Sequence, residues 1–176
     1  LKQRATIIKR IRDFFQSRGV WEVETPLLSH ASIPDPNIPS FALANGLYLQ
    51  TSPEFAMKRL LAADSGDIFQ ICKAFRHDEV SKTHNPEFTM LEWYRVDFDH
   101  HQLMDEMDAL LQTLLNTNRP ADRLTYQAVF EKTLAINPHT ASIDDLKQCA
   151  EQHILSIEGK LTKDEWLDVL FTHLIQ

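Results

Sequence analysis

Two strand-like runs joined by a short polar segment constrain the fold of this chain most. Residues 68–76 and 85–95 are rich in apolar and aromatic residues, and the segment between them is polar. Because the side chains of a strand alternate between two faces, one face of the second run carries an aromatic ring, a carboxylate and a phenol in sequence. We predict an antiparallel hairpin whose face presents Phe88, Met90, Glu92 and Tyr94.

Arg76 ends the first run on the same face as Gln70, Cys72 and Ala74. A guanidinium is a rigid fork of donors that matches phosphate or carboxylate oxygens. The same arginine could instead be a surface residue at a strand end, paired with Asp78 or its neighbour Glu79. Taken alone, this residue favours the surface interpretation.

Glu92 lies between Met90 and Tyr94 on its face of the second run. A carboxylate among apolar and aromatic neighbours is unfavourable unless a cation meets it. A substrate ammonium would provide that cation, and so would Arg76 or Lys58. Both the binding and the structural interpretations stay open at this point.

A helix start precedes the hairpin at residues 51–54. Ser52 is the expected N-cap, Pro53 the first helical residue, and Glu54 an acid in the positive first turn. Glu54 could simply complement the helix dipole, an effect of about 0.3–1 kcal/mol. Together with Glu92 and the arginine, it would suit a zwitterionic amino acid, with ammonium on the acids and carboxylate on the guanidinium.

The remaining pattern predicts an α+β chain in two parts. The first 99 residues mix helix and strand, and residues 100–176 are helical. We therefore divide the chain at residues 1–99 and 100–176, with the boundary in the range 97–120, because the helix that begins at His100 could still pack on the sheet. The expected helices are 4–18 (closed by Gly19), 52–63, 100–116, 125–135, 143–152 and 163–175; the further strands are 20–24 and 47–49, with a loop over 29–45.

The charge is divided unevenly. Residues 1–96 carry 12 Lys+Arg against 11 Asp+Glu, whereas residues 97–176 carry 6 against 14. The second part is thus a poor partner for a phosphate backbone. No apolar run is long enough to span a membrane. Two distant cysteines, Cys72 and Cys149, match no metal spacing and favour reduced thiols in a cytoplasmic protein.

Metal and phosphate motifs are not evident. The histidines show no ligand spacing with cysteines or acids, so we predict no metal site from them. The chain has four glycines and neither GxGxxG nor GxxxxGK[ST]. A nucleotide would therefore bind on a sheet with arginines. His84 and Asn85, at the end of the turn, are either solvated or directed at a phosphate.

Three ordered segments resemble the class II aminoacyl-tRNA synthetases. RGVWEVETP (18–26) resembles their motif 1, the dimer-interface element. FRHDE followed by HNPEFTMLEWY (75–94) resembles motif 2 in its lysine-specific form, and TSPEFAMKRL (51–60) resembles the amino-acid-binding helix start of lysyl-tRNA synthetases. The resemblance implies the antiparallel catalytic sheet of this family, flanked by helices and followed here by a helical insertion.

The match is best to the lysyl-tRNA synthetase paralogues that lysylate translation elongation factor P. The resemblance implies activation of lysine, and preferentially β-lysine, by ATP and its transfer to a lysine of that factor. It also implies a homodimer formed through the motif 1 region. Magnesium would neutralise the phosphates, with ligands in the motif 3 part of the family domain.

Residue roles follow from the same resemblance. Ser52, Pro53 and Glu54 are expected to line the lysine pocket, and Glu92 and Tyr94 to contact the lysine side of it. Arg76 is expected to act in catalysis by bridging the substrate carboxylate and the α-phosphate, Phe88 to stack under adenine, and Asp78 to stand where the family usually has glutamate. The implied ATP-binding residues are Arg76, His77, Asp78, His84, Asn85 and Phe88.

The chain departs from the family by matching motifs 1 and 2 but not motif 3. We therefore expect residues 1–99 to be the first half of a catalytic core and 100–176 an acidic insertion, and expect this chain alone to be inactive. Two alternatives remain. One is a lysyl-tRNA synthetase fragment that charges tRNA, and the other is a non-catalytic synthetase-like binding module.

Overall fold

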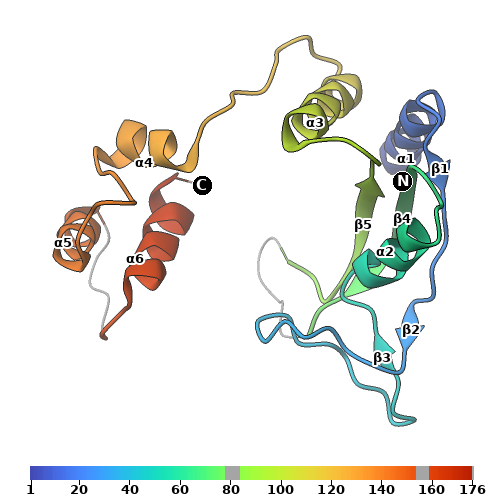
Figure 1. The fold of residues 1–176 in the computed structure, drawn as a ribbon, viewed down its shortest axis with the longest axis horizontal. Coiled ribbons are helices and arrows are strands. Elements are labelled where there is room, and N and C mark those ends of the chain that lie inside the picture. The colour runs from blue at the N-terminus through green and yellow to red at the C-terminus, as the bar shows by residue number, and fades with distance from the viewer. Residues whose placement is uncertain (78–83, 154–158, 176) are drawn as a thin grey trace. The chain divides into compact units, whose positions relative to one another are not determined.

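The computed structural model describes residues 1–77, 84–153 and 159–175, in two compact units, Leu1–Pro120 and Ala121–Gln176 (Figure 1). The first unit contains all the strands of the described residues, and the second contains helices. This mixture of helix and sheet agrees with an α+β class.

The predicted hairpin forms the centre of the first unit. Strand β4 (Ile68–Phe75) pairs with β5 (Glu87–Tyr94) in antiparallel register, from Ile68↔Tyr94 to Phe75↔Glu87. Strand β1 (Trp21–Glu22) is shorter than the predicted 20–24 and pairs with β4 in parallel, which gives the order β1-β4-β5. The antiparallel hairpin is thus as predicted, and the short β1 adds a parallel pairing that the sequence pattern does not predict; the chain between β1 and β4 is long enough for the crossover that this pairing needs.

One face of this sheet carries the core of the unit. Helices α1 (Lys2–Gln16) and α3 (His100–Leu115) pack against it and against each other (Figure 1). The ring of Phe15 lies 4.7 Å from that of Phe69 and 5.4 Å from that of Trp93. The buried residues of the cluster are Ile11, Phe14, Phe15, Val20, Phe69 and Leu110, and Ile71, Leu91 and Trp93 pack against them.

Helix α3 belongs to this core, which is the alternative that the sequence leaves open for the helix beginning at His100. Asp99 caps its start, with its side chain accepting from the Gln102 amide and the Gln102 side chain accepting from the Asp99 amide. Leu110 is 2% exposed within the core. The structural division therefore falls at residue 120 and not at 99, because the apolar face of α3 is buried on the sheet.

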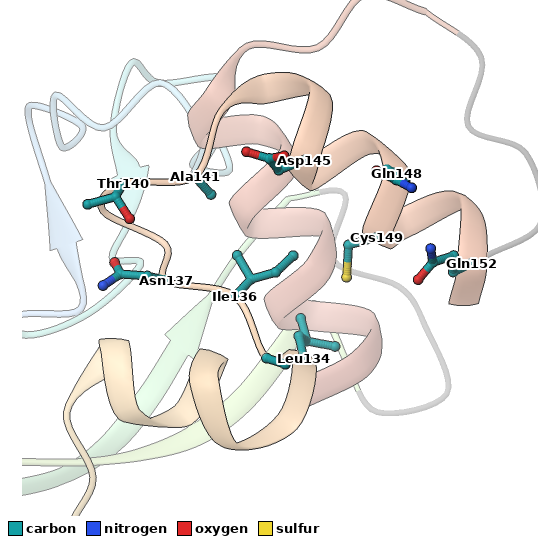
Figure 2. Close-up of a pocket in the computed structure, with 10 residues that line it drawn as sticks. Leu134, Ile136, Asn137, Thr140, Ala141, Asp145, Gln148, Cys149 and Gln152 are labelled. Atoms are coloured by element: carbon teal, nitrogen blue, oxygen red, sulfur yellow. The ribbon is translucent and has the colours of Figure 1, made fainter.

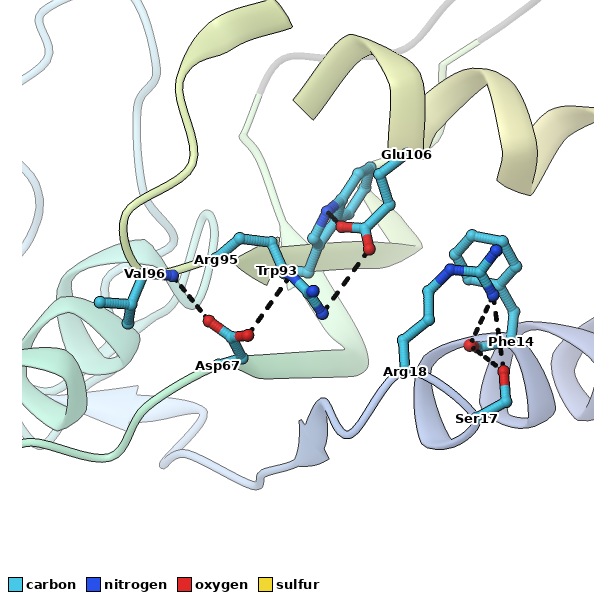
Figure 3. Close-up of polar contacts among 8 residues, drawn as sticks. All are labelled: Phe14, Ser17, Arg18, Asp67, Trp93, Arg95, Val96 and Glu106. Carbon is cyan, nitrogen blue, oxygen red and sulfur yellow. Dashed lines mark hydrogen bonds and ion pairs between the residues drawn. The ribbon is translucent and has the colours of Figure 1, made fainter. Parts of the chain in front are cut away.

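A buried ionic cluster fastens α3 to the hairpin (Figure 3). Arg95, whose side chain is 11% exposed, lies 3.4 Å from Asp67 and 3.6 Å from Glu106. Trp93 Nε1 donates to Glu106 at 3.1 Å, and the Val96 amide donates to Asp67 at 2.6 Å. The cluster thus ties the end of β5 to the middle of α3 and to the turn before β4.

Helix α1 ends two residues earlier than predicted. Gly19 adopts φ +72°, and the Val20 amide donates to the Phe15 carbonyl, so the chain reverses beyond Gln16. Arg18 Nη1 donates to the Phe14 carbonyl at 3.1 Å (Figure 3). Gly19 therefore plays the predicted terminating role.

A small second sheet leads into helix α2 (Glu54–Ala62). Strand β3 (Tyr48–Leu49) lies within the predicted 47–49, but its antiparallel partner β2 (Leu28–Ser29) falls partly in the segment we assigned to a loop. Pro53, and not Ser52, occupies the N-cap position of α2. The Ser52 hydroxyl still accepts a hydrogen bond from the Glu54 amide at 3.3 Å, two residues along, which is a spacing found in N-caps.

The second unit contains α4 (Tyr126–Leu134), α5 (Ile143–His153) and α6 (Lys163–Leu170), close to the predicted ranges. The last helix differs in that Phe171–Ile175 is a π-helical turn. The core of the second unit consists of Phe130, Ala141, Leu146, Cys149, Ala150, Trp166 and Leu170. Across the described parts of both units, no helix combines the length and apolar character needed to cross a bilayer.

We expect Glu106→Ala to lower the free energy of unfolding of the first unit by about 3–5 kcal/mol, because it leaves Arg95 buried with one acid instead of two. Urea unfolding followed by intrinsic tryptophan fluorescence measures this change. Glu151→Gln removes only an exposed pair with Lys147 at 3.7 Å and should change stability by less than about 0.5 kcal/mol. Equal effects of the two substitutions would show that the buried cluster adds nothing.

Candidate functional site

The face of the sheet opposite the core borders a cavity of about 470 Å³. Five predicted site residues line it together: Ser52, Glu54, Arg76, Glu92 and Tyr94. The other lining residues are Ile33, Pro34, Asp35, Ile38, Thr51, Phe55 and Met90. Residues that are far apart in sequence thus meet where the alternation argument placed a binding face.

The hairpin register explains this meeting. Glu92 pairs with Gln70 and Met90 pairs with Cys72, so the even-numbered residues of both strands share one face. The first turn of α2 brings Glu54 to the same cavity.

Three successive backbone amides at the end of β4 bind the chain segments that surround the cavity. The Phe75 amide donates to Gln50 at 2.9 Å, the Arg76 amide to Pro86 at 2.9 Å, and the His77 amide to Pro39 at 3.0 Å. Each bond reaches a different segment of the chain. These bonds therefore fix the segments around the cavity at the point in the chain where Arg76 follows β4.

The Arg76 side chain is half-buried and oriented on two sides. Its Nε donates to the Thr51 carbonyl at 3.4 Å, and its guanidinium carbon lies 5.2 Å from the centroid of the Phe88 ring. The proposed alternative partners Asp78 and Glu79 lie outside the described residues. A planar donor group held against a carbonyl and a ring is suited to bind an anion.

Glu92 carries the most perturbed carboxylate of the cavity. Burial raises its pKa, and the nearby Glu54 raises it further, while a hydrogen bond from Tyr94 (2.6 Å) and the charge of Lys58 lower it. The pKa of Tyr94 is raised by its own burial and then by this bond. A raised pKa is expected of a carboxylate in a cavity whose charged form would be stabilised by binding a cation.

Glu54 is more exposed and forms an ion pair with Lys58 at 2.5 Å, one turn along α2. This pair matches the helix-dipole interpretation and leaves the second carboxylate oxygen for another partner. The charged residues that line the cavity are therefore the acids Asp35, Glu54 and Glu92 and the base Arg76. A zwitterionic amino acid fits such an arrangement.

The other predicted residues occupy different positions. Pro53 is fully buried under the start of α2 and does not line the cavity. His77 is exposed, with its ring 4.9 Å from that of Phe41. His84 and Asn85 are exposed just before β5 and outside the cavity lining. Their roles in binding remain predictions, and Asp78 lies outside the described residues.

Sequence reasoning missed the wall formed by the loop before β3. Ile33 and Ile38 are half-buried there and line the cavity together with Pro34 and Asp35. We had assigned this segment only as a loop. Apolar side chains at intervals in a proline-rich stretch were the available signal, because such residues pack against something.

A second cavity of about 500 Å³ lies in the second unit, between the end of α4 and α5 (Figure 2). It has one acidic lining residue, Asp145, and no basic one, and Asp145 is already bonded to Ser142 at 2.7 Å. Such a lining does not suit a phosphate or carboxylate ligand. The predicted site residues all lie in the other unit.

No group of three or more His, Cys, Asp or Glu residues in the described ranges could hold a metal ion. We therefore assign no magnesium ligands to residues 1–77, 84–153 or 159–175. Of the residues predicted to bind ATP, Arg76 places its guanidinium over the ring of Phe88, 5.2 Å from the ring centroid, and Phe88 is not among the residues that line the cavity.

Comparison with models of protein families shows which family the chain belongs to. The model of the class II tRNA synthetases (D, K and N) matches residues 1–168. The chain belongs to this family. The shared domain includes both the hairpin and the cavity described above, so the expected class II synthetase resemblance is confirmed.

Several curated relatives of this class II chain are elongation factor P–(R)-β-lysine ligases. The chain is 54% identical to an elongation factor P–(R)-β-lysine ligase of Pseudoalteromonas translucida over 97% of its length. It is 50% identical to the ligase of that name from Vibrio cholerae over 98%, and 44% identical to that from Haemophilus influenzae over its full length. The chain spans 56–57% of the length of these relatives.

We expect Glu92→Gln to stabilise the ligand-free protein at pH 7–8. Because the pKa of Glu92 is raised on folding, the folded state binds the proton more tightly, and stability falls as pH rises through that raised value. The gain from the substitution should therefore shrink as pH falls toward about 4, where the carboxyl is protonated in both states.

Melting temperatures of the two proteins across pH 4–8 measure this difference. Glu87→Gln is the matched control, because Glu87 lies on the same strand in an exposed pair with Lys73 at 2.7 Å. It should give no comparable pH-dependent gain. A gain from Glu92→Gln that is constant with pH would contradict the ionisation argument.

Proposed function

We propose that the protein containing this chain uses ATP to activate lysine, and preferentially (R)-β-lysine, and transfers it to a lysine of elongation factor P. The observation that carries the proposal is the cavity that Arg76, Glu54 and Glu92 line together. The names of the related ligases supply the acceptor and the isomer.

The amino acid would bind across the cavity. Its carboxylate would meet Arg76, and its ammonium groups would meet Glu54 and Glu92, with Ser52 and Tyr94 completing the pocket. The raised pKa of Glu92 supports this assignment, since an incoming ammonium would stabilise the charged carboxylate. Pro53 would act only indirectly, by fixing the start of α2 from its buried position.

ATP would lie with its adenine on Phe88 and its α-phosphate at Arg76, which the 5.2 Å separation of guanidinium and ring supports. His77, Asp78, His84 and Asn85 are proposed as further nucleotide contacts on family resemblance. Magnesium would neutralise the phosphates, and its ligands are not assigned here.

The chemistry then requires mainly positioning and charge stabilisation. A carboxylate oxygen of the substrate attacks the α-phosphorus, the bond to pyrophosphate breaks, and an aminoacyl-adenylate forms. Arg76, able to contact both reacting groups, would stabilise the charge that develops on the phosphoryl oxygens. The ε-amine of the acceptor lysine attacks the acyl carbon, and AMP leaves with the bonding electrons.

Two further properties are part of the proposal. A homodimer through residues 18–26 is supported by Trp21, which is 72% exposed next to the core. A cytoplasmic location is supported by Cys72 and Cys149, which are free thiols.

Charging of tRNA is the second candidate, because the matching family is named for it. The complete gene product, given ATP, labelled (R)-β-lysine or lysine, and both tRNA and elongation factor P, separates the two. Label on the protein factor supports the proposal, and label on tRNA overturns it in favour of the synthetase. No label on either acceptor, and no pyrophosphate exchange, would favour a non-catalytic binding module.

We expect Arg76→Lys to reduce kcat/KM for lysine-dependent pyrophosphate exchange by about 10²–10³-fold, because lysine cannot reproduce the bidentate fork. The matched control is Arg119→Lys, which changes an exposed arginine in the segment after α3. The control should retain full exchange activity. An Arg76→Lys enzyme with normal kcat/KM would remove this arginine from the reaction.

A further inference from the structure

Thr51 presents a buried hydroxyl that the fold does not use. The residue is 2% exposed, and its Oγ1 has no hydrogen-bond partner among the described residues. Most buried polar atoms in native proteins have such a partner, and an unpaired one destabilises the fold. The described residues therefore leave this hydroxyl without a partner, and a bound ligand is a group that could supply one.

The position of Thr51 shows which ligand could supply it. Thr51 lines the site cavity, and its own carbonyl accepts from Arg76 Nε at 3.4 Å. The hydroxyl thus belongs to the residue whose carbonyl orients Arg76, the side chain that would bind a carboxylate. Glu54 and Glu92 lie on other elements of the same cavity.

A neighbouring cavity of about 300 Å³ shares this wall. It is lined by Thr51 together with Ile33, Pro34, Ser52 and Phe55, all of which also line the site. Thr51 is therefore part of the wall of both spaces, although its Oγ1 itself is buried. A ligand group beside the carboxylate end of the site would reach the hydroxyl after a rotation of this side chain or a small shift of its neighbours.

We propose that Thr51 Oγ1 accepts a hydrogen bond from the substrate amino group nearest the carboxylate, and that it thereby helps the site to distinguish an α-amino from a β-amino acid. The inference rests on the proposed function. Its physical basis is that the two isomers place this amine on adjacent carbons. Once the carboxylate is fixed by Arg76, a single acceptor of fixed position favours one isomer over the other.

Three substitutions in the complete gene product test this role. Thr51→Val keeps the shape and removes the hydroxyl, whereas Thr51→Ser keeps the hydroxyl. Thr25→Val is the matched control, because the half-buried Thr25 hydroxyl donates to Gln70 Oε1 at 3.0 Å and lies outside the cavity. Melting temperature without ligand, and KM for lysine, (R)-β-lysine and ATP in pyrophosphate exchange, are measured for each.

We expect Thr51→Val to keep or raise the melting temperature, because an unpaired buried hydroxyl is removed. Its KM should rise about 10–100-fold for the preferred isomer, the loss typical of a hydrogen bond to a charged group, with a smaller change for the other isomer and for ATP. Thr51→Ser should restore the preference. Thr25→Val should lower the melting temperature and leave each KM unchanged.

The proposal is overturned if Thr51→Val lowers the melting temperature as Thr25→Val does and leaves both amino-acid KM values unchanged, since Thr51 is then structural. It is also overturned if KM rises equally for the two isomers. A wild-type protein that exchanges pyrophosphate with neither isomer fails the proposed function instead, and the assignment of Thr51 falls with it.

Discussion

The pairing of β4 with β5 is the interaction on which the rest of the first unit depends. With Ile68 opposite Tyr94, the period of two sends Phe69, Leu91 and Trp93 to one face and Glu92 to the other. The first face is covered by α1 and α3 and supplies the core. A slip of one residue would bury the carboxylate in the core and expose the rings, so one register determines both stability and site.

Two arginines at opposite ends of this hairpin differ in their surroundings. Arg95 has its charge balanced by Asp67 and Glu106 in a largely buried cluster. Arg76 lies at the cavity, where its side chain contacts the Thr51 carbonyl and the ring of Phe88. In the same cavity, burial raises the pKa of Glu92. The first arrangement joins elements of the fold, whereas the second lies at the surface that we propose binds the substrate.

Local signals predicted the hairpin, α1 and the helices of the second unit, because alternation, periodicity and caps act within a few residues. The sequence also placed Arg76, Glu54 and Glu92 in one site. It predicted the helix 100–116 but left open whether that helix packs on the sheet, because its apolar face finds its partner only in the folded protein. It did not predict the parallel pairing of β1, which depends on a strand far away in the chain. The wall around Ile33 and the unused hydroxyl of Thr51 were missed for a similar reason, since burial is a property of the assembled fold.

The site is assembled by the end of β4 more than by any single loop. The consecutive amides of Phe75, Arg76 and His77 bond to Gln50, Pro86 and Pro39, which belong to three separate segments. The segment that contains Gln50 also delivers Thr51, Ser52 and Glu54, and the proline-rich loop delivers Ile38. Any shift of Arg76 would therefore move the amine-binding side as well. This linkage fixes the distance between Arg76 and the acids proposed to bind the amine, Glu54 and Glu92. A site needs such a fixed distance to distinguish substrates whose amines lie on different carbon atoms.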